Sequence, residues 1–250
     1  MKSVLVLAAI VPAVLLMLKV YQADRLEREP VPLLLNLVFW GVVATELAAL
    51  SEQVGILLLE LLLRPRDTVA WKISWAPLGA VSSRNDVLYD VLLYFGVVAI
   101  SEEGIKYLLL RFRTWNHQEF NCTFDGVVYA VTLSLGFALW ENIHYVLTYG
   151  LSTAAARAVT AVPGHACFGV FMGTWYGFAK KASLQGQEGR SRLFRALAVA
   201  IPMLLHGVYD YIAAARIQDL GWVFLPFIGC MFAASWLLVK MMAKRDGYIQ

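Results

Sequence analysis

Apolar segments long enough to cross a lipid bilayer follow one another along most of this chain. A helix needs about 20 apolar residues for one crossing. Of the 250 residues, 60% are hydrophobic and 16% are charged, whereas soluble domains are about 45–50% apolar and about 25% charged. The sequence predicts an all-α polytopic membrane bundle with about seven transmembrane helices, or eight if the long second segment crosses twice. The approximate segments are 3–20, 31–63, 87–110, 124–149, 157–179, 193–215 and 222–241.

The composition also excludes several classes of protein. The links between segments are too short for a large soluble domain, so residues 1–250 are expected to form one transmembrane domain. A net charge of +3 is too small to indicate binding to nucleic acid. Cys122, Cys167 and Cys230 are far apart, and two of them fall within apolar segments, so they support neither a disulfide framework nor a cysteine zinc site.

The links predict how the chain is oriented in the bilayer. With seven crossings, the side that holds the C-terminus carries 13 lysines and arginines and the other side carries 7. Because basic residues mark the cytoplasmic side, the C-terminus is expected in the cytoplasm. Trp71 and Trp75 predict that the link 64–86 lies along the membrane interface. The segment 31–63 is longer than a bilayer requires, which favours a tilt or a bend near Ser51.

Two adjacent carboxylates and a lysine interrupt the third apolar segment: Glu102, Glu103 and Lys106. A charged side chain at membrane depth costs on the order of 2.5–3.5 kcal/mol, so such residues mark functional sites by default. On a helix, Lys106 lies one turn from both carboxylates and partly neutralises them. Taken alone, this group also fits a buried structural salt bridge.

Three later segments add further polar residues, which are Glu141, Asn142, His144, His165, His206 and Asp210. Counted from the cytoplasmic end at about 1.5 Å per residue, Glu141 and the two later histidines lie roughly 20–25 Å deep and Glu103 about 10–15 Å deep. Four helices that offer polar groups to one interior volume predict a water-filled site within the membrane. His144 lies near the end of its segment and is expected at the interface.

Small residues follow His165 at a regular spacing. Gly169, Gly173 and Gly177 come at intervals of four, so all four residues share one helical face. Small residues at this spacing let another helix approach closely. Coming directly after Pro163 and Gly164, His165 also suits the start of a helix. The polar link 180–192 is expected to be the most flexible one.

These residue types suit hydrolysis. A buried carboxylate such as Glu103, beside the like-charged Glu102, can take a proton from water. His206, oriented by Asp210 one turn on, can polarise a scissile carbonyl or hold a metal, and Asn142 can donate to an oxyanion.

The same residues leave it equally open whether hydrolysis would use a zinc ion. His165 and His206 with one glutamate, Glu103 or Glu141, would supply three ligands and leave a fourth position free. No His-Glu-x-x-His motif is present, and the ligands would come from separate helices. Hydrolysis with zinc and hydrolysis without it therefore both remain open.

Four motifs in order resemble one known family, the PrsW intramembrane proteases. They are Glu102-Glu103-x-x-Lys106, Phe137-x-x-x-Glu141-Asn142, His165 with its glycines, and His206-x-x-x-Asp210. That family is similar in turn to the type II CAAX prenyl endopeptidases and the bacteriocin-processing enzymes. The resemblance covers about residues 87–215, which we expect to be the catalytic core.

The resemblance implies a multi-pass protease of the bacterial cytoplasmic membrane. Its substrate would be a membrane-anchored protein, with site-1 cleavage of an anti-sigma factor in stress signalling as the best-known role. By the motif match, the essential residues would be Glu102, Glu103 and His206. His165, Glu141 and Asn142 would complete the site, with Lys106 and Asp210 in support. The related prenyl proteases are argued to activate water with glutamate and histidine, which leaves the metal open.

Two other classes of protein fit parts of the pattern. A proton- or cation-coupled transporter would use the paired acids and the His206–Asp210 unit as a relay, although the two halves of the sequence show no repeat. A non-catalytic scaffold that binds other membrane helices would use the glycine face. A scaffold should tolerate Glu103→Gln, whereas a protease should not.

Overall fold

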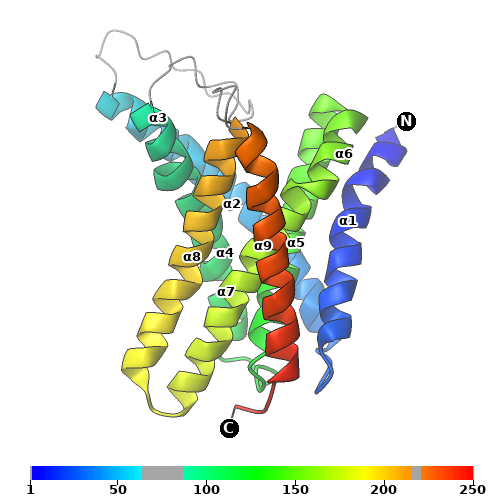
Figure 1. Ribbon diagram of the computed structural model, residues 1–250, viewed down its shortest axis with the longest axis vertical. Helices are drawn as coiled ribbons and strands as arrows, with labels where there is room; N and C mark the ends of the chain where they lie inside the picture. The colour runs from blue at the N-terminus through cyan, green and yellow to red at the C-terminus, as the bar shows by residue number, and fades with distance from the viewer. Residues whose placement is uncertain (1, 64–86, 215–220, 250) are drawn as a thin grey trace.

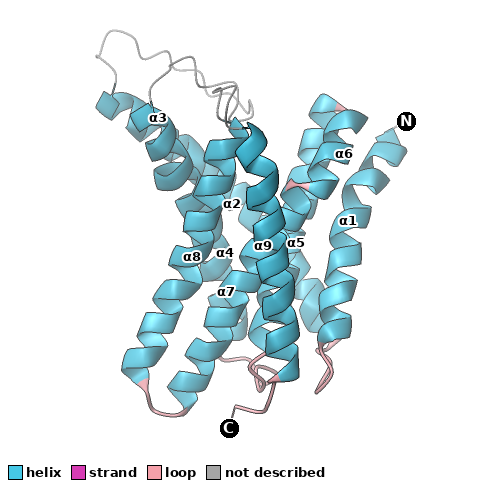
Figure 2. Cartoon of the chain, viewed as in Figure 1, coloured by secondary structure: helices cyan, strands magenta, loops and turns pink. Residues whose placement is uncertain are grey.

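The chain forms a bundle of helices in the computed structural model, which describes residues 2–63, 87–214 and 221–249. Figure 2 shows helices joined by short loops, and the described residues contain no β-structure beyond one isolated bridge between Cys122 and Tyr248. The predicted all-α fold class is confirmed. The helices are α1 (Lys2–Ala23), α2 (Val31–Leu63), α3 (Val87–Val91), a π-helical segment (Leu92–Val98), α4 (Ala99–Thr114), α5 (Asp125–Tyr149), α6 (Leu151–Val159), α7 (Ala161–Leu184), α8 (Glu188–Ala214) and α9 (Gly221–Lys244).

The long helices run side by side, and the two chain ends lie at opposite ends of the bundle (Figure 1). Because α3, the π-helical segment and α4 continue one another, the described part of the chain contains seven long helical segments and the short α6. Four of them, in α2, α5, α8 and α9, are long and apolar enough to cross a membrane by length and composition alone. α4 is not among these, because it is only 16 residues long, and Glu102, Glu103 and Lys106 also interrupt its apolar sequence.

Two expected boundaries differ from the observed ones. α2 is a continuous helix from Val31 to Leu63, and the tilt or bend near Ser51 stays a prediction. The expected link 180–192 is wrong in extent: α7 continues to Leu184, and only residues 185–187 connect it to α8. Gly186 has φ 72°, a left-handed conformation that glycine adopts without strain and that ends a helix. The segment expected from 157 to 179 is divided, because the chain breaks at Thr160 between α6 and α7. The link 64–86 lies outside the described residues.

Close backbone packing between α5 and α7 lies at the centre of the bundle. α5 packs mainly against α7, α2 and α1, and its residues 125–138 are all buried. A Cβ atom added at Gly126 would lie 2.7 Å from the Gly173 carbonyl oxygen, and one added at Gly169 would lie 2.9 Å from the Val131 Cα. The close helix approach predicted from the glycine spacing is therefore confirmed, and the partner helix is α5.

We expect Gly173→Ala to destabilise the protein, because the new methyl group would overlap the backbone of Gly126 and Val127. Overpacking of this kind costs about 1–3 kcal/mol, which would lower the midpoint of thermal unfolding in detergent. The matched control is Gly229→Ala in α9, where an added Cβ meets nothing within 4 Å. A midpoint that falls equally in both variants would contradict this account of the packing.

Candidate active site

A buried lysine ammonium lies between two buried carboxylates of α4. Lys106 and Glu103 are 0% exposed and Glu102 is 6% exposed. The Lys106 Nζ lies 3.0 Å from Glu102 Oε2 and 2.8 Å from Glu103 Oε1. It also lies 3.8 Å from the centroid of the Phe137 ring, whose face attracts a cation. The partial neutralisation predicted from the helical spacing is confirmed.

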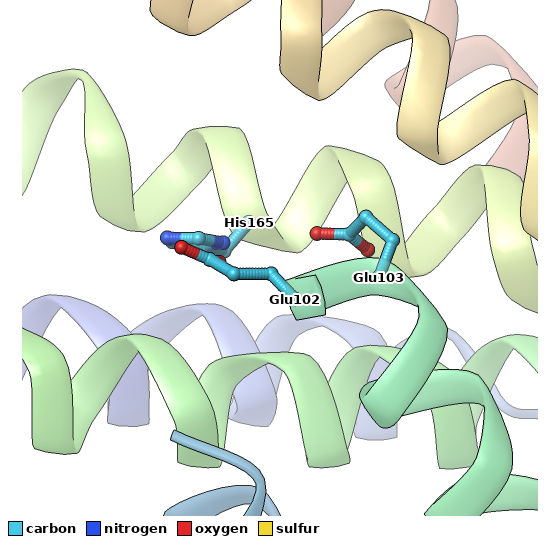
Figure 3. Close-up of side chains that lie close together, drawn as sticks. All are labelled: Glu102, Glu103 and His165. Atoms are coloured by element: carbon cyan, nitrogen blue, oxygen red, sulfur yellow. The ribbon is translucent and has the colours of Figure 1, made fainter. Parts of the chain in front are cut away.

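His165 of α7 joins this group to Glu141 of α5. The Lys106 Nζ lies 3.2 Å from His165 Nδ1, and His165 Nε2 lies 2.9 Å from Glu141 Oε2. An ammonium can only donate and a carboxylate accepts, so Nδ1 accepts and Nε2 donates in a neutral ring. The Ser134 hydroxyl also donates to the His165 carbonyl oxygen at 2.9 Å. In Figure 3 the Glu102 side chain lies alongside the His165 ring, whereas Glu103 leaves the same turn of α4 in another direction.

His206 of α8 contacts a carboxylate through each ring nitrogen. Nδ1 lies 2.9 Å from Glu103 Oε1, and Nε2 lies 3.3 Å from Asp210 Oδ2. The ring stacks on Phe168, with 4.6 Å between centroids. A ring that carries hydrogen on both nitrogens satisfies both carboxylates and is then a cation. The contact between His206 and Asp210 that the spacing predicted is present.

Arg157, on the short helix α6, also belongs to this network. Its Nη2 donates to Glu141 Oε2 at 2.7 Å, and its Nε donates to Asn142 Oδ1 at 3.1 Å. Its guanidinium carbon lies 3.9 Å from the Tyr145 ring centroid. Arg157 did not emerge from the sequence as a site residue. The one available signal was an arginine in a segment that is otherwise apolar.

Asn142 does not lie where a donor to an oxyanion, its expected role, would have to lie. Its Nδ2 donates to the Ala9 carbonyl oxygen of α1 at 3.1 Å, and its Oδ1 accepts from Arg157. Both ends of the amide are therefore occupied, and the side chain is 0% exposed. In this geometry Asn142 positions Arg157 and anchors α1, and its amide does not border the cavity in which an oxyanion would form.

The network borders a cavity of about 200 Å³. Glu102 is the one member of the α4 carboxylate pair among the lining residues, while Glu103 and Lys106 lie behind the cavity wall. Tyr94 and Val98, from the wide turns of the π-helical segment just before α4, form part of the wall. The other polar and charged lining residues are Glu141, Arg157, His165, His206 and Asp210, and the remaining ones are Tyr145, Ala161, Phe168, Tyr209, Ala213 and Ala214.

Opposite charges nearly balance around the cavity. Four carboxylates, of Glu102, Glu103, Glu141 and Asp210, contact Lys106, Arg157 and His206. Glu52 of α2 is close enough to interact electrostatically with several of these groups. A buried charge without a partner costs several kcal/mol, so the alternation of sign explains how so many ionisable groups are accommodated inside an apolar bundle.

The residues that could hold a metal differ in part from those expected. Ligand atoms of Glu102, Glu103 and His165 lie within 4.8 Å of one another. His206 and Glu141, the other expected ligands, are not in this group: Glu141 lies on the opposite nitrogen of His165. Two carboxylates and an imidazole form a donor set that suits zinc, and Glu103 Oε2 is buried with no hydrogen-bond partner. The three donors therefore fit a metal, although the Lys106 ammonium contacts the same three residues.

A helical membrane bundle with acids and histidines around an internal cavity is the arrangement of an intramembrane hydrolase. Residues 29–239 match the family described as PrsW family intramembrane metalloprotease. The chain belongs to this family and is an intramembrane protease.

Curated relatives support this assignment. The Protease PrsW of Geobacillus kaustophilus is 31% identical over 98% of this chain and 93% of its own length. The Protease PrsW of Halalkalibacterium halodurans is 34% identical over 65% of this chain and 71% of its own length. The Protease PrsW of Bacillus subtilis is 30% identical over 88% of this chain and 87% of its own length. No solved structure matches the chain.

We expect Lys106→Met to destabilise the protein strongly, because it leaves Glu102 and Glu103 buried without their shared cation. Removing one partner from a buried ion pair costs about 3–5 kcal/mol. Thermal unfolding in detergent should show a large decrease in the midpoint. Lys244→Met, at the exposed end of α9, is the matched control.

A second substitution tests why the unfolding midpoint of Lys106→Met should decrease. Adding Glu102→Gln to Lys106→Met removes one uncompensated charge, so the double variant should recover part of the lost stability. Equal midpoints for the single and the double variant would show that lost packing, and not lost charge balance, destabilises Lys106→Met.

Proposed function

We propose that the chain hydrolyses a peptide bond of a membrane-anchored protein with water activated by a glutamate in this cavity. The observation that carries the proposal is that Glu102, His165 and His206 line one cavity inside an apolar bundle. A cavity of about 200 Å³ accommodates several water molecules, since a water occupies about 30 Å³ in the liquid.

Glu102 is the proposed general base. It borders the cavity, whereas Glu103 is fully buried and contacts Lys106 and His206. The sequence favoured Glu103 for this role, and the cavity geometry favours its neighbour. Glu102 takes a proton from water, the oxygen attacks the scissile carbonyl carbon, and the protonated carboxyl then gives the proton to the leaving amine.

His206 is the proposed electrostatic stabiliser of the carbonyl oxygen, through the positive charge of its ring. Its ring lines the cavity between Asp210 and Glu103, and both of its nitrogens have carboxylate partners. The resulting imidazolium stabilises the negative charge that develops on the oxygen in the transition state. Glu103 and Asp210 hold the ring in place, and Phe168 stacks on its face.

Glu141 and Arg157 complete the site by orienting His165. Arg157 neutralises Glu141, and Glu141 fixes the hydrogen of His165 on Nε2. The Nδ1 lone pair of His165 then points toward Lys106 and the α4 carboxylates. We propose residues 87–215 as the catalytic core, with α1 supporting it through the contact between Ala9 and Asn142.

The family description implies a metal, which Glu102, Glu103 and His165 would hold. A bound zinc ion would polarise the scissile carbonyl and make water more acidic. Lys106 contacts the same three side chains, so the ammonium and a metal compete for them. With zinc bound, Glu102 would be a ligand and not the free base, so the two arrangements differ in the role of Glu102.

We further propose an anti-sigma factor as the substrate and the bacterial cytoplasmic membrane as the location. The substrate class is what the family resemblance implies for a site-1 protease. For the orientation, the α1–α2 link, the α7–α8 link and the C-terminus lie at one end of the bundle (Figure 1). Lysines and arginines concentrate in these segments, so we place this end in the cytoplasm.

Cleavage of a tagged single-span substrate tests the proposal. Glu102→Gln should lower the turnover rate by about 10²–10⁴-fold, the usual contribution of a general base, and His206→Ala should also abolish most activity. Glu188→Gln, on the exposed start of α8, should cleave like the wild type. Thermal unfolding must confirm that each variant is folded. Full cleavage by folded Glu102→Gln would exclude this residue as the base. An absence of cleavage by the wild type with several such substrates would favour the transporter and scaffold alternatives.

Metal content of the purified protein tests the competition at Lys106. If the three donors bind zinc, Lys106→Met should retain more zinc than the wild type, because a competing positive charge is removed, and His165→Ala should retain less. Elemental analysis after dialysis gives the zinc-to-protein ratio, with His117→Ala as the control for a histidine outside the site. The same ratio in all four proteins would contradict metal binding by these donors.

A further inference from the structure

A second group of buried carboxylates lies at the end of the bundle that holds the C-terminus. Asp24 and Glu29 belong to the link between α1 and α2, and Asp125 is the first residue of α5. These segments meet at the lower end in Figure 1. One oxygen of each carboxylate lies within 4.8 Å of one oxygen of the other two. Asp125 and Glu141 are separated along α5 by about 24 Å at 1.5 Å per residue, so this acidic triad is distinct from the active site.

The acidic triad is almost completely withdrawn from solvent, and three of its six carboxylate oxygens have no hydrogen-bond partner. Asp24, Glu29 and Asp125 are 1%, 4% and 1% exposed. The backbone N–H of Glu27 points toward Asp24, but neither Asp24 carboxylate oxygen accepts a hydrogen bond within normal limits. Asp125 Oδ2 accepts from the backbone nitrogens of residues 121 and 122, while Oδ1 has no partner. Buried carboxylate oxygens of this kind require a proton or a cation.

Basic side chains do not supply the missing charge. Among the described residues, no lysine, arginine or histidine nitrogen lies within 4.0 Å of the three carboxylates. Arg28 of the same link lies over the Tyr21 ring, 5.6 Å from its centroid. Asp246, which follows α9, adds negative charge: its Oδ1 accepts from Phe124 N at 2.8 Å, and its Oδ2 is buried without a partner.

We propose that the acidic triad binds a Ca²⁺ ion. All the unpartnered atoms that could bind a metal ion are carboxylate oxygens, which suit calcium or magnesium. Calcium accepts six to eight oxygens in irregular geometry, whereas magnesium usually keeps several of its waters, so a buried cluster favours calcium. Asp24 can offer both of its oxygens, Asp125 offers Oδ1, and Glu29 offers an oxygen beside the Tyr129 hydroxyl, which donates to Glu29 Oε2 at 2.6 Å.

The ion would join two separate parts of the chain. Two of its ligands come from the α1–α2 link and one from the start of α5. The C-terminal tail is attached to the same place, since Ile249 N donates to Asn121 O at 2.8 Å and Cys122 pairs with Tyr248. Calcium binding would therefore stabilise this end of the bundle without touching the cavity.

A shared proton is the alternative way to hold the acidic triad together. Burial raises the pKa of Glu29 to about 9 and the pKa of Asp24 to about 6. A protonated Glu29 beside Asp125 would reduce the repulsion without any cation. The two arrangements differ in their response to calcium, because a proton-bridged triad gains nothing when calcium is added.

Thermal unfolding of the purified full chain in detergent distinguishes the calcium-bound triad from the proton-bridged one. After removal of calcium with EGTA, saturating Ca²⁺ should raise the unfolding midpoint of the wild type by about 5 °C or more, and Mg²⁺ should raise it less. Asp24→Asn should abolish the shift. Without calcium its midpoint should equal or exceed that of the wild type, since one unpaired buried charge is gone. Glu29→Gln provides a second variant if Asp24→Asn does not fold.

Glu27→Gln is the matched control, because Glu27 lies in the same link but outside the triad and accepts from Asn121 Nδ2 at 3.3 Å. It should keep the full calcium shift. Equilibrium dialysis should find calcium bound to the wild type and lost in Asp24→Asn. An identical midpoint of the wild type in EGTA and in Ca²⁺ would overturn the proposal in favour of the shared proton. A full shift in folded Asp24→Asn would place the calcium elsewhere, for example at Glu102 and Glu103.

Discussion

The ion pair between Lys106 and the two glutamates of α4 is the constraint on which the rest of the site depends. One ammonium that is wholly withdrawn from solvent compensates two carboxylates and also reaches His165. Each further buried group then has a partner of opposite charge or a hydrogen-bonding atom: His206 for Glu103, and Glu141 for His165. This alternation lets an apolar bundle contain many buried ionisable groups, and it makes the position of each of these groups dependent on its neighbours.

The close approach of α5 and α7 keeps this network compact. Facing glycines bring the two backbones together below the site, and His165 and Glu141, one on each helix, meet at 2.9 Å. α4 and α8 add Glu102 and His206 to the lining of the cavity. The geometry of the site is therefore a result of backbone packing at positions that carry no chemistry of their own.

The sequence was sufficient for the fold class and for most of the acids, bases and histidines at the cavity, because spacing within a helix determines which side chains share a face. The pairing of Lys106 with both glutamates and of His206 with Asp210 followed from this rule. Contacts between helices could not be obtained in the same way. Arg157 lies on α6, a separate helix that ends just before α7 begins. The orientation of Asn142 depends on its contact with Ala9 of α1. Which of the two adjacent glutamates borders the cavity depends on the rotation of α4 in the bundle.

The order of the charged groups along the chain has a consequence for biosynthesis. Among the charged groups of the site, those of α4 are translated first. Glu141 and His165 follow, and His206 comes last, on α8. Until α8 inserts, Glu103 lacks the imidazole that it contacts in the complete bundle, and one wall of the cavity is absent. Under the proposed mechanism, a nascent chain without α8 is an inactive precursor, so proteolytic competence would appear only after α8 has inserted.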